Sequence, residues 1–258
     1  MTSNSTDLMA FKKVFGKQNY QILDDNYKSK LMNHPLINGI FTTGKSFVII
    51  ANTHEWSIEL VTGDTMSLTG YNNEELLSMG GKFTLDYPIK EHIPTNMATV
   101  KSAMEYIVLC PVQQREMVFV IYYYKAQKSN GDIVTVQHQS IPLIFDEQKI
   151  PYIFCNIYTD ISYLDATNIP HGLILNKSTG ETFNVNHNNL QLEKTEDVFS
   201  SREKEIIRLL TTGYTSKKIA DFLHISYNTV RTHRKNILNK AGVSNTASLL
   251  KYVMINGL

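Results

Sequence analysis

Cysteine is scarce in this chain of 258 residues, which contains only Cys110 and Cys155. Two cysteines make neither a disulfide framework nor a zinc site, so the sequence predicts no metal centre. Both lie among apolar or β-branched neighbours, and we interpret them as buried thiols rather than redox groups.

Long hydrophobic runs are also missing. The longest run of apolar and aromatic residues, MVFVIYYY at 117–124, is too short to span a bilayer. The first residues, MTSNSTDLMAFKKVFGK, are polar and then basic, with no apolar stretch behind them. We therefore expect a soluble protein that is not exported and stays in the cytoplasm.

Neither charge is in excess overall, because 25 Lys and Arg stand against 24 Asp and Glu. The signs are nevertheless segregated: residues 200–258 hold ten basic and three acidic residues, and the remainder holds 15 and 21. A small basic module beside an acidic body predicts an end that binds a polyanion. The length predicts two domains of unequal size, and a content of 42% hydrophobic residues is typical of globular proteins.

Catalytic motifs are absent as well. The sequence has no nucleophile elbow, P-loop, dinucleotide glycine motif, metal-spaced set of His and Cys, or paired acids in a supporting motif. The alternating βα units of a phosphoreceiver, with their acidic cluster and Lys, are not recognisable either. We therefore expect no enzyme activity and no phosphorylation control of the response-regulator kind.

The pattern of residues 42–165 predicts an α+β domain with an antiparallel sheet. FVIIAN and WSIELV are short β-branched runs, GDTMSLTGYNNEELLSMG predicts two short helices broken at Gly70 and Asn72, and a longer helix follows Pro94. Three strands, EMVFVIYYYKAQ, DIVTVQHQSIPLIF and KIPYIFCNIYTDI, are separated by the turn-like SNGD and DEQK, which predicts a meander.

This order of elements, with LTGYNNEELL, the turn at 130–132 and the closing 159–161, resembles a PAS sensor domain. The landmarks turn the chain, close a hairpin and cap a helix, so the resemblance implies a fold and no chemistry. Residues 1–41 are expected to add a helix or two packed against this body. Residues 166–198 are expected to hold a hairpin with its turn at 178–180 and a polar interdomain linker, NHNNLQLEKTED.

Residues 199–258 predict an all-α domain of four helices. The first three are expected to begin at the N-caps Ser201, Thr215 and Ser226. Two short helices with a tight turn, followed by a longer basic helix, are the elements of a helix-turn-helix. The expected core residues are Ile206, Ile207, Leu210, Ile219, Ala220, Leu223, Val230, Ile237 and Ala241.

One face of the third helix carries the candidate binding residues. At helical spacing, Asn228, Arg231, Thr232 and Lys235 fall opposite the core stripe. A helix that reads DNA has to present such a row of donors to base edges and phosphates in the major groove. A solvated charged face is the plain alternative for an arbitrary basic helix.

The string SREKEIIRLLTTGYTSKKIADFLHISYNTVRTHRKNILNKAGVSN resembles the LuxR (GerE) helix-turn-helix along its whole length. The resemblance implies base reading by Arg231, Thr232 and Lys235, and phosphate contacts at Thr215, Ser216, Lys217, Asn228, Thr229 and Arg234. Arg234 lies near the core side of the helical wheel. Ala241 stands where the family usually has Leu, and Thr246 where it often has Arg, which puts a contact of the final helix in question. His233 is expected to be a packed structural residue.

The resemblance implies a transcription regulator that binds double-stranded DNA as a homodimer, with RNA polymerase as a further candidate partner. For the PAS-like domain two interpretations stay open: a pocket for an unidentified small molecule, or a dimerisation module without ligand. The flavin-binding motif Asn-Cys-Arg-Phe is absent, and His92 or His138 as a haem ligand is disfavoured. A receptor for acyl-homoserine-lactone-like signals, or an enzyme with a DNA-binding tail, are the remaining alternatives.

Overall fold

The computed structural model describes residues 9–10, 13–14, 45–163, 172–186, 189–195 and 198–256. The helices expected in residues 1–41 therefore lie almost wholly outside the described residues. The chain divides into two compact units, Met1–Lys194 and Thr195–Leu258. Among the helices that are described, none has the length and apolar character needed to cross a membrane.

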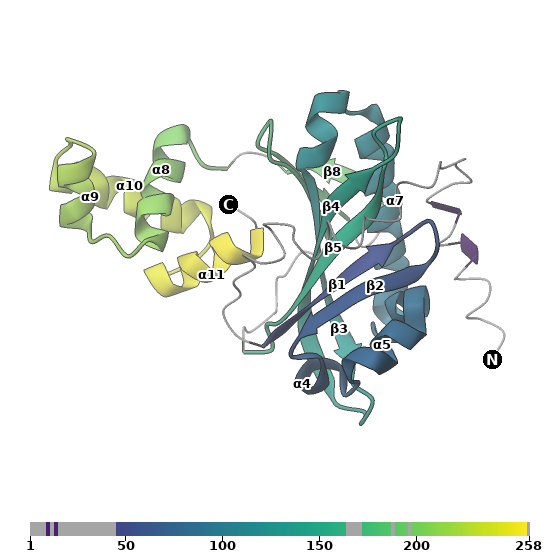
Figure 1. Ribbon diagram of the computed structural model, residues 1–258. Coiled ribbons are helices and arrows are strands. Elements are labelled where there is room, and N and C mark those ends of the chain that lie inside the picture. The colour runs from purple at the N-terminus through teal and green to yellow at the C-terminus, as the bar shows by residue number, and fades with distance from the viewer. Residues whose placement is uncertain are drawn as a thin grey trace. The chain divides into compact units, whose positions relative to one another are not determined.

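The first unit is built on an antiparallel sheet of eight strands in the order β2-β1-β5-β4-β3-β6-β7-β8 (Figure 1). The strands are β1 (Ser46–Asn52), β2 (Ser57–Gly63), β3 (Val118–Gln127), β4 (Ile133–Phe145), β5 (Pro151–Asp160), β6 (Gly172–Asn176), β7 (Glu181–Val185) and β8 (Leu192–Lys194). Strands β3, β4 and β5 are neighbours in the sheet, as the predicted meander requires. The expected α+β class with a PAS-like antiparallel sheet is confirmed.

Helices connect β2 to β3: α4 (Thr65–Thr69), α5 (Asn73–Met79), α6 (Phe83–Asp86) and α7 (Ile93–Leu109), with short 3-10 turns at Gly80–Lys82, Lys90–His92 and Val112–Met117. The break between the first two helices is built locally. Gly70 takes a left-handed φ of 76°, and Asn72 caps α5 in a capping box with Glu75. Pro94 lies in the first turn of α7, where its missing N–H costs no hydrogen bond.

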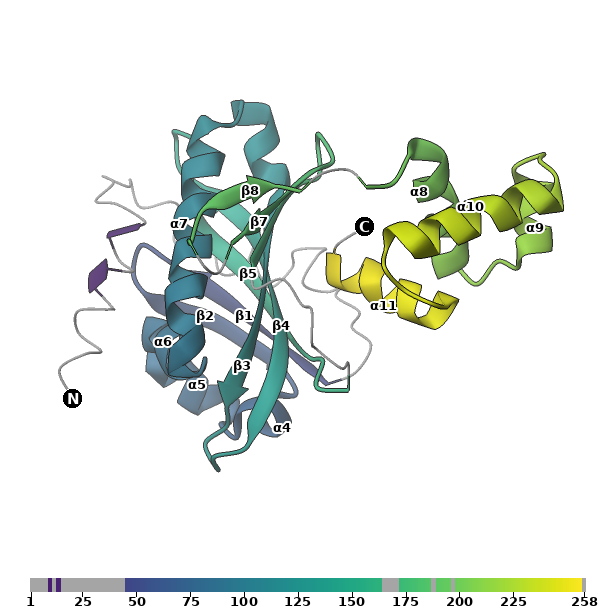
Figure 2. The same ribbon diagram turned by 180° about the vertical axis from the view of Figure 1, so that it is seen from behind.

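Helix α7 lies across one face of the sheet, as Figure 2 shows most clearly. The main core forms between them because the strands alternate: Val134, Val136 and His138 of β4 are buried on the core side. Phe47, Phe83 and Ile107 are among its largest fully buried side chains.

The hairpin expected in residues 166–198 is present as β6 and β7, with its turn at 178–180, and it continues the sheet. Strand β6 pairs with β3, from Val118↔Asn176 to Tyr122↔Gly172, and β7 and β8 extend the sheet beyond it. All five residues of β6 are buried. The backbone N–H and C=O groups of a buried segment need hydrogen-bond partners, and a neighbouring strand supplies them. Within the predicted linker, Leu192–Lys194 form the edge strand β8.

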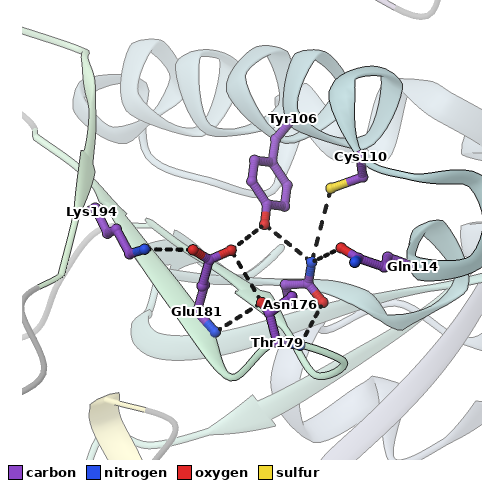
Figure 3. A network of polar contacts seen from close by, with 7 residues as sticks. All are labelled: Tyr106, Cys110, Gln114, Asn176, Thr179, Glu181 and Lys194. Atoms are coloured by element: carbon purple, nitrogen blue, oxygen red, sulfur yellow. Dashed lines mark hydrogen bonds and ion pairs between the residues drawn. The ribbon is translucent and has the colours of Figure 1, made fainter.

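A polar network ties this extension to the end of α7 (Figure 3). Tyr106 Oη donates to Glu181 Oε2 over 3.2 Å, and Lys194 Nζ donates to Glu181 Oε1 over 2.5 Å. Hydrogen bonds from Lys194 and Thr179 lower the pKa of Glu181. Asn176, which is buried, donates from Nδ2 to Tyr106 Oη over 3.1 Å. The network joins α7 to β6, β7 and β8.

The second unit consists of α8 (Ser201–Thr211), α9 (Ser216–Phe222), α10 (Tyr227–Lys240) and α11 (Thr246–Asn256). Its core holds the predicted stripes of α8 and α10, with Ile206, Ile219, Val230 and Ile237 fully buried. Leu223 and Ala241 are partly buried against this cluster.

The predicted N-cap of α8 is wrong by one residue. The cap is Ser200, whose hydroxyl accepts from the backbone N–H of Glu203, while the Glu203 carboxylate accepts from the backbone N–H of Ser200. This reciprocal capping box satisfies two otherwise unpaired donors, which Ser201 has no Glu at the right spacing to do. The predicted caps Thr215 and Ser226 are confirmed.

Candidate nucleic-acid interface

Helices α9 and α10 are held by their caps and by a tight turn. Thr215 Oγ1 accepts from the backbone N–H of Lys218, and Ser226 Oγ accepts from that of Thr229. Between the helices, His224 takes a φ of 51°, an uncommon conformation for a residue other than glycine. Two short elements and a tight turn thus fix the direction in which α10 presents its outer face.

The outer face of α10 carries the predicted stripe. Asn228, Arg231, Thr232 and Lys235 are exposed, whereas Val230 and Ile237 on the other side are fully buried. The division follows the 3.6-residue period, because the apolar face of the helix packs against the core and the polar face stays in water. Thr232 is partly engaged, because its Oγ1 donates to the carbonyl of Asn228 over 3.1 Å.

A hollow of about 520 Å³ lies along this face. Three cations contribute to its wall, Arg231, Arg234 and Lys235, and no Asp or Glu stands among its described residues. The rest of the wall consists of Ser216, Tyr227, Leu238, Asn239, Val243 and Ser244. Such a surface attracts an anion, because the positive charges face no carboxylate that would neutralise them.

Arg231, Lys235 and Lys217 are free cations within the described part of the chain, where they form no salt bridge. Lys217 is exposed in the first turn of α9. Arg202 and Lys240, in contrast, are paired with Glu205 and Glu203. The unpaired side chains are therefore the ones that can exchange water for phosphate or base edges.

Arg234 has a different role in the structure. It is half-buried, and its guanidinium donates to Ser216 Oγ over 2.5 Å and to Thr246 Oγ1 over 2.6 Å. It thus connects the first turns of α9 and α11 behind the exposed face. Sequence reasoning missed this connection and treated Thr246 only as a departure from a pattern, because a contact between separate helices leaves no local signal.

The remaining predicted phosphate contacts lie at helix starts. Thr215 and Ser216 are at the beginning of α9, and Thr229 is in the first turn of α10 with its hydroxyl 2.8 Å from Ser226 Oγ. Thr215, Asn228 and Thr229 are exposed but do not line the hollow. The structure therefore gathers Ser216, Arg231, Arg234 and Lys235 in one place and leaves the other predicted residues around it.

An ion pair between a buried carboxylate and a partly exposed lysine links two helices of the module. Lys240 Nζ lies 2.6 Å from Glu203 Oε2, and the Glu203 side chain is only 5% exposed. Burial raises the pKa of this carboxyl, but hydrogen bonds from Lys240 and Ser200 lower it by more, so that the pKa lies below its usual value. The pair joins α8 to the end of α10.

The two histidines weighed as haem ligands lie in the first unit. His92 ends a short 3-10 turn, and His138 is buried, with Nε2 2.9 Å from Asn156 Oδ1 and Nδ1 3.4 Å from Tyr124 Oη. Both ring nitrogens of His138 are thus engaged with protein atoms. No cluster of three or more His, Cys, Asp or Glu that could hold a metal ion occurs in the described ranges.

The fold and the exposed face of α10 define the second unit as a helix-turn-helix module. Residues 197–253 match the family described as "Bacterial regulatory proteins, luxR family" (GerE). The second unit is therefore a LuxR-type helix-turn-helix domain.

Among similar proteins is the transcriptional regulatory protein TdiR of Thauera aromatica, 38% identical over 97 residues, which cover 38% of this chain and 40% of TdiR. The match thus spans less than two thirds of that relative. The VqmA dimer of Vibrio cholerae is similar over 88% of each chain, at 15% identity and a TM-score of 0.32. A PAS domain from Colwellia psychrerythraea is similar over its whole length and 54% of this chain, at 14% identity and a TM-score of 0.35.

Proposed function

We propose that this protein is a sequence-specific DNA-binding regulator of transcription that acts in the cytoplasm. The observation that carries the proposal is the hollow along α10, where Arg231, Arg234 and Lys235 meet without a carboxylate. A helix in the major groove reads base edges with such side chains, and exposed cations such as Lys217 add sequence-independent affinity for the backbone. Homodimerisation and a contact with RNA polymerase stay predictions, and the proposal needs no catalytic activity.

The first unit supplies the regulatory part of this proposal. The mainly apolar and aromatic lining of its cavity, with a few polar groups, supports a small-molecule pocket over a module that serves dimerisation alone. The cavity volume of about 100 Å³ argues against an acyl-homoserine lactone, because a cavity of about 150 Å³ holds only one benzene ring. A lactone ring with its acyl chain exceeds that size.

Selection of binding sites from random double-stranded DNA tests the proposal with the full-length protein. We expect one enriched motif, bound at least about a thousandfold more tightly than random duplex at physiological salt. Affinity for random duplex should fall steeply with salt, because the released counterions are those of the phosphates. Failure to enrich a motif, with equal affinity for all duplexes, would contradict the proposal.

A further inference from the structure

A cavity lies inside the first unit, between the sheet and α7. Its volume is about 100 Å³. The floor comes from β1, β3, β4 and β5, and the roof includes Asn96, Val100, Ala103, Met104 and Ile107, which recur along one face of α7. Because a cavity of about 150 Å³ holds one benzene ring, this one limits an occupant to no more than about one ring.

The wall of the cavity carries no formal charge. None of its described lining residues is Asp, Glu, Lys or Arg. Burial lowers the pKa of His138 to about 4, so this imidazole is neutral near pH 7. An ion without a partner in such a site would lose its hydration without compensation, and the occupant has to be uncharged.

The floor presents ring edges to the occupant. Tyr122, His138 and Tyr158 are cross-strand neighbours, and Phe47 continues the row on β1. His138 lies between Tyr122 at 4.8 Å and Tyr158 at 4.2 Å, and Tyr158 is also stacked on Phe47 at 4.5 Å. With both faces covered, His138 and Tyr158 expose their edges, whose positive partial charge favours the π-face of an aromatic ring.

Some of the polar groups that line the cavity have no hydrogen-bond partner among the described residues. Asn96 Oδ1 is buried without a hydrogen-bond partner, which costs free energy unless a donor reaches it. The hydroxyls of Tyr122 and Tyr158 also make no hydrogen bond to the described residues. An occupant with an N–H or O–H group would satisfy Asn96 Oδ1.

We propose that this cavity binds an uncharged aromatic molecule of about one ring that carries an N–H or O–H donor. The proposal identifies the signal of the regulator proposed above. Ligand binding itself does not depend on the proposed function, and only its consequence, a change in DNA affinity, rests on that function.

Trp56 makes the test direct, because it is the only tryptophan of the chain and lines the cavity. The full-length protein, without DNA, is titrated with phenol, 2-pyridone, toluene and benzoate, followed by Trp56 fluorescence and calorimetry. We expect phenol or 2-pyridone to bind with a Kd below about 1 mM, which a ligand of this size can reach. Toluene, which has no donor, should bind several-fold more weakly, and benzoate not measurably.

Two matched variants localise the site. Asn96→Leu should weaken phenol or 2-pyridone binding about threefold to tenfold, the value of one hydrogen bond. Asn184 Oδ1 is also buried without a partner but does not line the cavity, so Asn184→Leu should leave binding unchanged. The comparison of probes on the unaltered protein stands even where a variant fails to fold.

The proposal is overturned if neither phenol nor 2-pyridone binds with a Kd below about 1 mM, if toluene or benzoate binds as tightly as phenol, or if both variants lose affinity equally. A gel-shift measurement on the same samples distinguishes a failure of the ligand proposal from a failure of the proposed regulator function. Retained DNA binding without probe binding refutes only the ligand, whereas probe binding without any DNA binding refutes only the regulator function.

Discussion

Arg231 and Lys235 differ from Lys217 in what they are expected to contact. If the first two reach bases, replacing either by Ala should cost roughly 1–3 kcal/mol at the preferred site and relax the sequence preference there. Lys217→Ala should instead weaken binding to all sequences and reduce the salt slope by about one. Titration of specific and random duplexes over a salt series measures both. Equal losses on both duplexes for Arg231→Ala would remove this residue from the base-reading set.

His138 predicts a pH dependence of the first unit. Burial lowers its pKa from 6.5 to about 4, so the unfolded chain binds a proton in this window that the folded unit does not. The first unit is therefore most stable above pH 6.5. Its free energy of unfolding decreases as the pH falls towards 4, by about 2 kcal/mol between pH 7 and pH 5. Urea unfolding followed at Trp56 measures it. His138→Gln should remove this part of the slope, and an unchanged slope would contradict the assignment.

The exposed and buried residues of α10 were predictable, because a cap, a core stripe and an exposed stripe are all local patterns. Arg234 was not, since its partners Ser216 and Thr246 lie on other helices. The aromatic row of Tyr122, His138 and Tyr158 depends on strand register, which the sequence of each strand does not contain. Side chains alternate along a strand, so the three consecutive tyrosines of β3 cannot all face one side. Tyr123 points away from Tyr122 and Tyr124, yet it is buried too.

Elements β6, β7 and β8 depend on the network at the end of α7. The Nδ2 of Asn176, whose side chain is 1% exposed, has three acceptors within hydrogen-bonding distance, and its Oδ1 accepts from two backbone N–H groups. Asn176→Ala should therefore lower the free energy of unfolding by roughly 3 kcal/mol, because several buried hydrogen bonds are lost together. Lys194 is largely exposed, and Lys194→Ala should cost less than about 1 kcal/mol.

Urea unfolding of both variants, followed at Trp56, compares these two losses. Hydrogen exchange should also quicken in β6 and β7 of the Asn176 variant while β4 and β5 stay protected. Equal destabilisation by the two substitutions would mean that the network is not the main support of this edge of the sheet.

The two units are expected to fold independently. The second unit closes its own core around Ile206, Ile219, Val230 and Ile237, and a fragment from Thr195 onward contains it whole. About 60 residues is near the lower limit for independent folding, so the fragment should be helical but only marginally stable. Circular dichroism with thermal unfolding checks this. An unfolded fragment from a folded parent chain would show that the first unit is needed to complete the module.

The full-length protein is expected to bind as a homodimer to two half-sites about one helical turn apart. A single recognition helix reads only a few base pairs, and a second module held nearby binds at a high effective concentration. We favour pairing through the first unit, so sedimentation should show a dimer that survives deletion of residues 200–258. A monomer at tens of micromolar that protects one half-site alone in footprinting would count against this arrangement.

The sequence by itself determined the order of the longer helices, of strands β1 to β7 and of the helix-turn-helix module, because caps, hydrophobic periods and turn residues act over a few neighbouring positions. It also determined which side chains of α10 face water. Only the tertiary structure decided that Gly172–Asn176 completes the sheet beside β3, that Arg234 links α9 to α11, and that the cavity below α7 has an uncharged wall with an unpartnered Asn96. These features arise where residues distant in the chain meet, and their energies depend on burial that no local pattern specifies.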